Sequence, residues 1–139
     1  MSENKPHLKT NIPLWINILQ VIILAILSFQ TYACYFNPEL IYPGAVTNDA
    51  ATQAIYVLAG RNALMAVISL LALVRQNPRF YSFAFLMHSL RELQDMFISP
   101  LTGQPFYVFF VFLIVFVIPE ITAYFKLTKM ADEAEQAVA

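Results

Sequence analysis

The chain has 139 residues, of which 59% are hydrophobic, 14% are aromatic and 12% are charged, with a formal net charge of −1. Soluble domains carry roughly 25% charged residues, so this composition excludes a disordered chain and a nucleic-acid binder. The single cysteine, Cys34, excludes a disulfide framework and any zinc or iron–sulfur site that needs several cysteines.

Four apolar stretches of 20 to 24 residues account for the composition. A helix needs about 20 such residues to cross roughly 30 Å of hydrocarbon, and none of the stretches shows the period-two alternation of a strand. We therefore predict an all-α integral membrane protein that folds as a single domain, a four-helix bundle with up-down topology. The expected helices lie at about 12–35, 51–74, 80–99 and 105–126. A polar tail, expected as a frayed extension of the last helix, follows at 127–139.

Lysine and arginine residues predict the orientation of the helices. The connections at 36–50 and 100–104 contain neither residue, whereas six of the eight basic residues lie beside the opposite ends of the helices. By the positive-inside rule, segments that carry lysine and arginine stay in the cytoplasm. We therefore expect a multi-pass membrane protein with both termini in the cytoplasm. The six flanking residues are Lys5, Lys9, Arg75, Arg79, Lys126 and Lys129.

The remaining two basic residues and three of the acidic residues fall inside the expected helices. A charge at the bilayer centre costs about 2.5–3.5 kcal/mol, so these side chains should face the bundle interior and pair with one another. At 100° per residue, the third helix collects four polar residues within an arc of about 100° and places apolar residues opposite them. The polar face consists of His88, Arg91, Glu92 and Asp95, and the expected lipid face of Leu86, Leu90, Leu93 and Phe97.

The helical rise of 1.5 Å per residue gives each of these charges a depth. Arg61 falls about 2 Å from the midplane of the membrane and Glu92 about 4 Å from it. We therefore predict an ion pair between Arg61 and Glu92, with Asp95 as the other candidate partner. Arg91, also near the midplane, is placed to pair with a carboxylate or with Asn62.

On the fourth helix, Glu120 falls about 6 Å to the cytoplasmic side of the midplane. Its neighbour Pro119 has no backbone N–H and is expected to kink the helix and to free a carbonyl group one turn earlier, near Val115. The intramembrane charges fit two uses, a network that fixes helix packing or a binding or catalytic pocket, and the sequence leaves both open. The predicted polar cluster contains Arg61, Asn62, His88, Arg91, Glu92, Asp95 and Glu120.

The spacing of His88, Glu92 and Asp95 could present one nitrogen and two oxygen ligands on one helix face. Arg91 occupies the same face and would compete for the carboxylates, and His88 is the only histidine within the expected membrane helices. One histidine supplies at most one axial haem ligand, and the sequence lacks the paired Glu-x-x-His motif of di-iron bundles. We therefore expect neither a metal ion nor a cofactor.

Two short motifs carry a resemblance to a known family. Gly60-Arg61-Asn62 lies near the middle of the second helix, and the third helix carries the acidic run from His88 to Asp95. In these motifs and in size, the chain resembles the small four-helix DoxX-like membrane proteins, and more narrowly their BphX-like group. The resemblance implies a four-helix fold and places Arg61, Glu92 and Asp95 at the family's polar positions. The resemblance also implies a link to quinone-linked redox subunits. Because the relatives include membrane chaperones and cargo receptors, the resemblance implies no single activity for this chain.

Two functions follow from these features. The first is a small polytopic inner-membrane accessory or binding protein, whose buried polar cluster holds a lipophilic ligand or a partner membrane protein. The alternative is a small membrane enzyme or redox subunit, which acts on a quinone, sterol-like or aromatic substrate with Glu92 or Asp95 as acid/base. The scarcity of catalytic groups, the lack of a cofactor motif and the short connection at 100–104 favour the first function. We expect the lipid bilayer as a partner, and no nucleic acid.

Overall fold

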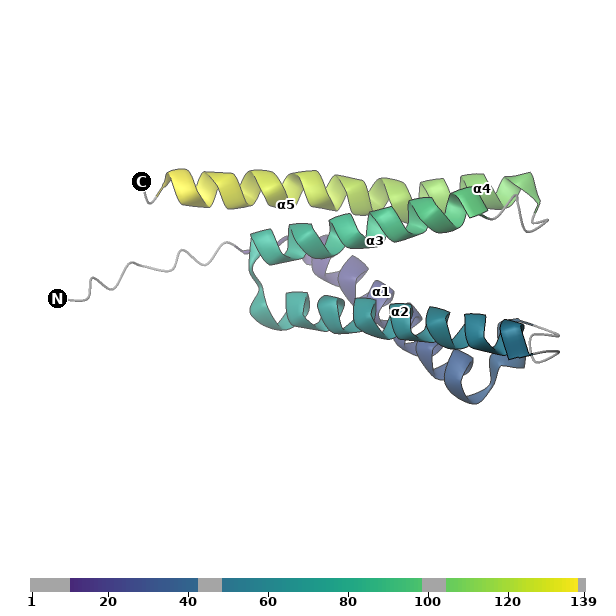
Figure 1. Ribbon diagram of the computed structural model, residues 1–139. Coiled ribbons are helices and arrows are strands. Elements are labelled where there is room, and N and C mark those ends of the chain that lie inside the picture. The colour runs from purple at the N-terminus through teal and green to yellow at the C-terminus, as the bar shows by residue number, and fades with distance from the viewer. Residues whose placement is uncertain (1–10, 43–48, 99–104, 138–139) are drawn as a thin grey trace. The chain divides into compact units, whose positions relative to one another are not determined.

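The computed structural model describes residues 11–42, 49–98 and 105–137, and within these segments the chain is all-α, with no strand (Figure 1). To this extent the predicted fold class is confirmed. The residues Lys5 and Lys9 and the connecting segments 43–48 and 99–104 lie outside the described residues. The elements are α1 (Leu14–Phe36), the 3₁₀ turn η1 (Pro38–Leu40), α2 (Asp49–Arg75), α3 (Pro78–Ile98), α4 (Phe106–Phe112), the π-helical turn η3 (Leu113–Val117) and α5 (Ile118–Gln136).

Three helical stretches among the described residues are long and apolar enough to cross a membrane. They are α1, α2 and the continuous helix α4–η3–α5, with 23, 27 and 31 residues, or about 34, 40 and 46 Å of helix. These stretches support a membrane-spanning protein. With 21 residues, or about 32 Å, α3 is also long enough, but its four charged residues make it too polar for the same class. A fourth span therefore stays a prediction.

The described residues pack as two compact units, α1 with α2 and α3 with the α4–α5 helix. In the first unit, the side-chain amide of Asn62 donates to the amide oxygen of Gln30 at 3.2 Å, and the rings of Tyr35 and Tyr56 stack at 5.9 Å. These pairs show that α1 and α2 are antiparallel. Tyr35, later in α1 than Gln30, contacts Tyr56, which is earlier in α2 than Asn62. The residues that α2 buries recur every three or four positions, as amphipathic packing requires. They are Ile55, Ala59, Asn62, Met65, Ser69 and Ala72.

A capped turn begins the second unit. Gln76 adopts a left-handed backbone conformation, with φ of 48°, which ends the preceding helix. Asn77 then caps α3, because its side-chain oxygen accepts hydrogen bonds from the backbone N–H groups of Arg79 (2.9 Å) and Phe80 (3.2 Å). Pro78 fills the first helical position, where no N–H is needed. This local chemistry fixes where α3 starts and hence where its polar residues lie.

The second unit consists of α3 lying along the α4–α5 helix (Figure 1). The side chains that α3 buries form one stripe of mixed apolar and polar residues. On the expected lipid face, Leu90 and Phe97 are exposed, and Leu86 and Leu93 are half-buried. The buried residues are Pro78, Tyr81, Ser82, Ala84, Phe85, His88, Ser89, Glu92 and Met96.

The α4–α5 helix changes its hydrogen bonding next to Pro119. In η3 the backbone N–H of Ile118 donates to the carbonyl oxygen of Leu113, five residues earlier, which makes a π-helical turn. Pro119 follows at once and cannot donate a backbone hydrogen bond. The irregularity expected at Pro119 thus takes the form of a wider turn. Val117 at its end and Glu120 just beyond it are both buried.

Helix α5 continues through most of the segment expected as a polar tail. Leu127 and Ala131 extend its buried stripe. Near its end, Glu135 and Asp132 lie 2.5 Å and 3.7 Å from the guanidinium of Arg79, at the start of α3. The amphipathic spacing and these ion pairs explain why the polar segment is helical. Because the ion pairs are more than half exposed, each contributes at most about 1 kcal/mol.

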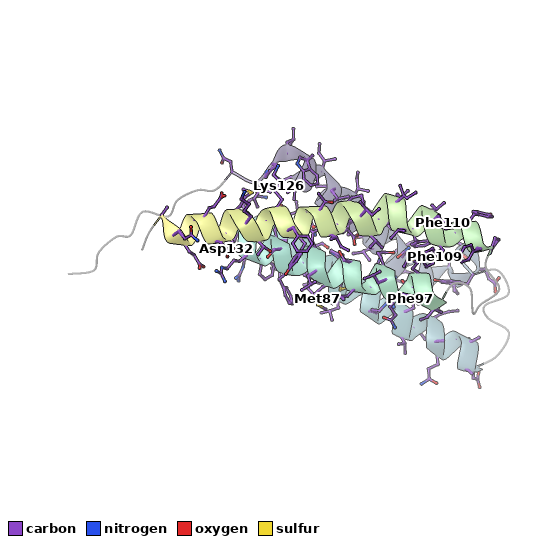
Figure 2. The ribbon with its side chains drawn as sticks, turned by 90° about the horizontal axis from the view of Figure 1, so that it is seen from above. Met87, Phe97, Phe109, Phe110, Lys126 and Asp132 are labelled. Carbon is purple, nitrogen blue, oxygen red and sulfur yellow. The ribbon has the colours of Figure 1, made fainter. Side chains whose placement is uncertain are left out.

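The two ends of the α4–α5 helix differ in chemistry. At the α4 end, the rings of Phe106, Phe109 and Phe110 contact one another with centroids 5.3 to 5.7 Å apart. Figure 2 shows Phe109 and Phe110 at this end, and Lys126 and Asp132 toward the other. The helix therefore exposes aromatic rings at one end and charges at the other, as expected of a helix that leaves a membrane for water.

Candidate functional site

Five of the seven residues of the predicted polar cluster belong to the second unit. Three of them, His88, Glu92 and Glu120, are buried, with 0%, 3% and 1% of their surface exposed. Arg91 and Asp95 are half-buried. The buried acids lie on different helices of the unit, Glu92 on α3 and Glu120 on α5, and α3 packs against α5.

The other two residues of the predicted cluster, Arg61 and Asn62, belong to the first unit. The amide nitrogen of Asn62 donates to Gln30, whereas its amide oxygen has no hydrogen-bond partner in the described ranges. Gln20 of α1 is fully buried, and neither of its amide atoms has a hydrogen-bond partner there. The predicted ion pair between Arg61 and Glu92 would join the two units, and it stays a prediction.

Arg91 and Glu92, neighbours in sequence, form an ion pair on α3 in which 11% and 3% of the side-chain surfaces are exposed. Arg91 also lies within electrostatic range of His88 and Glu120. One guanidinium therefore acts on two buried carboxyl groups. A cation this deeply buried is stable only while a carboxylate balances it, and Glu92 does so directly.

Glu120 occupies the first turn of α5, directly after Pro119. The Ser89 hydroxyl of α3 donates to the carbonyl oxygen of Phe85 at 2.8 Å and lies within hydrogen-bonding distance of the Glu120 carboxyl group. The second carboxyl oxygen, Oε2, is buried and has no hydrogen-bond partner among the residues that the structure describes. A buried oxygen left in this state costs about 1–3 kcal/mol, so the atom calls for an explanation.

These contacts define a site on the facing sides of α3 and α5. We name it the α3–α5 cluster: His88, Ser89, Arg91, Glu92 and Glu120. Chemically, it offers an ion pair whose charges balance and a carboxyl group with one oxygen open to a further hydrogen bond.

The buried face of α3 differs from the expected one. At 100° per residue, the centre of the buried face lies roughly 60° around the helix from the centre of the arc of charged residues, in the direction of Ser89. Arg91 and Asp95 consequently lie at its edge and are half-buried, whereas Ser89 and the apolar Phe85 lie within it. The sequence pattern places Ser89 outside the expected face because it counts charges alone. The signal that finds Ser89 is the pair of apolar residues one turn before His88 and Ser89, Ala84 and Phe85, which are both buried.

The described parts of the chain bring no three His, Cys, Asp or Glu side chains close enough together to hold a metal ion. Comparison of the chain with protein-family models, curated proteins and solved structures finds no match. The geometry of the α3–α5 cluster is therefore the basis for assigning a function.

Proposed function

We propose that this chain is a small polytopic membrane protein of the binding or accessory class, and that its polar cluster holds a lipophilic molecule. One observation carries the proposal: the carboxyl group of Glu120 is 1% exposed, and its Oε2 lacks a hydrogen-bond partner within the described residues. Ionisable groups inside membrane helices are costly and usually serve a function. A ligand group at Oε2 would supply the missing hydrogen bond.

The proposed setting is a bacterial inner membrane crossed by four helices, with both termini in the cytoplasm. The length of α3, about 32 Å, matches the hydrocarbon thickness, and the exposed Leu90 and Phe97 suit contact with lipid. Arg75 and Arg79 flank the connection between α2 and α3, which fits a cytoplasmic position for this turn. The likeness of Gly60-Arg61-Asn62 to DoxX-like proteins supports the same four-helix arrangement.

The ion pair on α3 favours binding over acid–base catalysis by Glu92. A general base must be able to exchange its proton with a substrate, whereas the Glu92 carboxylate is 3% exposed and held by Arg91. Glu92 and Arg91 therefore form a charge-balanced support for the cluster, and Glu120 is the group that remains open to a ligand.

Mass spectrometry of small molecules that co-purify with the protein in mild detergent tests this function. Wild-type protein should retain a lipophilic compound in about one copy per chain, and Glu120→Leu should retain much less. Glu133→Gln, at an exposed position on the same helix, is the matched control and should retain the compound like the wild type. Equal recovery from wild type and Glu120→Leu, or the same bulk phospholipids from both, contradicts the proposal.

A further inference from the structure

The open oxygen of Glu120 narrows the chemical class of the ligand. We infer that the α3–α5 cluster takes a lipophilic molecule that carries a hydroxyl group, placed to hydrogen-bond with Oε2 of Glu120. This inference rests on the function proposed above and deepens it. Its basis is the geometry of the cluster: the Glu120 side chain is 1% exposed, and its Oε2 is buried without a partner in the described segments.

A hydroxyl group fits Oε2 better than other ligand groups. An ionised carboxylate oxygen only accepts hydrogen bonds, whereas a protonated carboxyl group can also donate one. A hydroxyl both donates and accepts, so it completes Oε2 in either state, whereas a carbonyl or ether oxygen only accepts and an ammonium only donates. An ammonium would also bring a second cation into the electrostatic range of Arg91.

Apolar side chains flank Glu120 on both helices of the cluster. On α5 and the turn before it, Val117 lies one turn before Glu120 and Ala123 one turn after it, and these residues are 2% and 0% exposed. On α3, the turn before Ser89 contributes Phe85, which is fully buried. These three positions offer apolar surface to a molecule bound at Oε2. An apolar body with one hydroxyl matches both the apolar stripe and the single open oxygen.

Binding of matched fluorescent probes tests this inference. The probes are 2-naphthol, its methyl ether 2-methoxynaphthalene, and 2-naphthylmethylamine, each titrated into the purified full-length protein in mild detergent. Wild-type protein should bind 2-naphthol about threefold to tenfold more tightly than the methyl ether, as one hydrogen bond predicts. The preference should fall to about one in Glu120→Met. It should persist in Glu133→Met, the exposed control on the same helix.

Three results would overturn the inference. A wild-type preference below about twofold, a preference that persists in Glu120→Met, or tighter binding of the amine than of 2-naphthol would each exclude a hydroxyl at Oε2. If the probes bind without preference, the lipophilic site proposed above stands and the hydroxyl assignment fails. If none of them binds saturably, and no lipophilic compound co-purifies with the wild type, both fail.

An infrared measurement keeps the test valid if Glu120→Met does not fold. Adding 2-naphthol to the wild-type protein should shift the carboxyl or carboxylate band of Glu120, and adding the methyl ether should leave it in place. Glu120→Gln, which preserves the shape of the side chain, assigns the band. A band that responds equally to both probes would overturn the inference.

Discussion

Replacement of the two buried glutamates, one at a time, should change the stability of the protein in different directions. Glu92→Met removes the carboxylate that forms an ion pair with Arg91, whose side chain is 11% exposed. By analogy with buried ion pairs in soluble proteins, this loss costs about 3–5 kcal/mol.

Glu120→Met removes a group that is already incompletely bonded. Loss of the buried oxygen without a partner in the described residues gains about 1–3 kcal/mol, and loss of the contact with Ser89 costs about 0.5–1.5 kcal/mol. Methionine is close to glutamate in length and volume, so the packing term is small. The net change lies between a loss of about 0.5 kcal/mol and a gain of about 2.5 kcal/mol for the variant.

Reversible unfolding in mixed detergent micelles, followed by circular dichroism, measures both variants. Glu92→Met should be less stable than Glu120→Met by at least about 2.5 kcal/mol. Glu133→Met, exposed on α5, should stay within about 0.5 kcal/mol of the wild type. Equal destabilisation by the two buried substitutions would refute the reasoning, because Glu120 would then contribute to stability as a fully bonded group does.

Three further perturbations test the helices. In a Cys34→Ala background, Asn48→Cys should react with an impermeant maleimide in intact cells and Asn77→Cys should not, and the reverse pattern contradicts the topology. Asn77→Ala should lower the stability by about 1 kcal/mol because the cap of α3 is lost, and an unchanged unfolding midpoint would show that the cap contributes nothing. Phe85→Ala should cost about 3–5 kcal/mol and Leu90→Ala less than about 1 kcal/mol, since Phe85 is fully buried and Leu90 is 53% exposed. Similar losses at both positions would mean that the faces of α3 are assigned wrongly.

Length and composition suffice to predict the helices, because a run of about 20 apolar residues has few other structures open to it in a membrane. They do not predict how far α5 continues beyond Lys126. Its last turns are polar, and Glu135 meets Arg79, which lies 56 residues earlier in the chain. Contacts between residues so far apart in the sequence depend on the tertiary packing of α3 against α5. Helix propensity describes local preferences and does not predict them.

The candidate site follows from the sequence in part. Charge inside an apolar helix identifies Glu120 and Glu92 as residues that need partners. The depths of the residues in the membrane favour Arg61 as the partner of Glu92, and this pair stays a prediction. Depth alone does not identify the neighbouring Arg91, which forms an ion pair with Glu92 in the structure. The charge pattern does not identify Ser89, because its hydroxyl group is uncharged and the residue lies outside the arc of charged residues. The sequence also cannot show that Oε2 of Glu120 lacks a hydrogen-bond partner in the described residues, because this depends on the three-dimensional structure.

The side of the membrane on which α5 ends tests most directly whether α3, with its buried charges, crosses the membrane as a fourth span. Four spans bring the end of α5 back to the cytoplasm, whereas the three apolar stretches alone would leave it on the side opposite the N terminus. The measurement is maleimide labelling of Glu133→Cys, an exposed position on α5, in a Cys34→Ala chain whose Asn48→Cys counterpart labels in intact cells. Labelling of Glu133→Cys is expected only after the cells are permeabilised. Labelling in intact cells would contradict the fourth span.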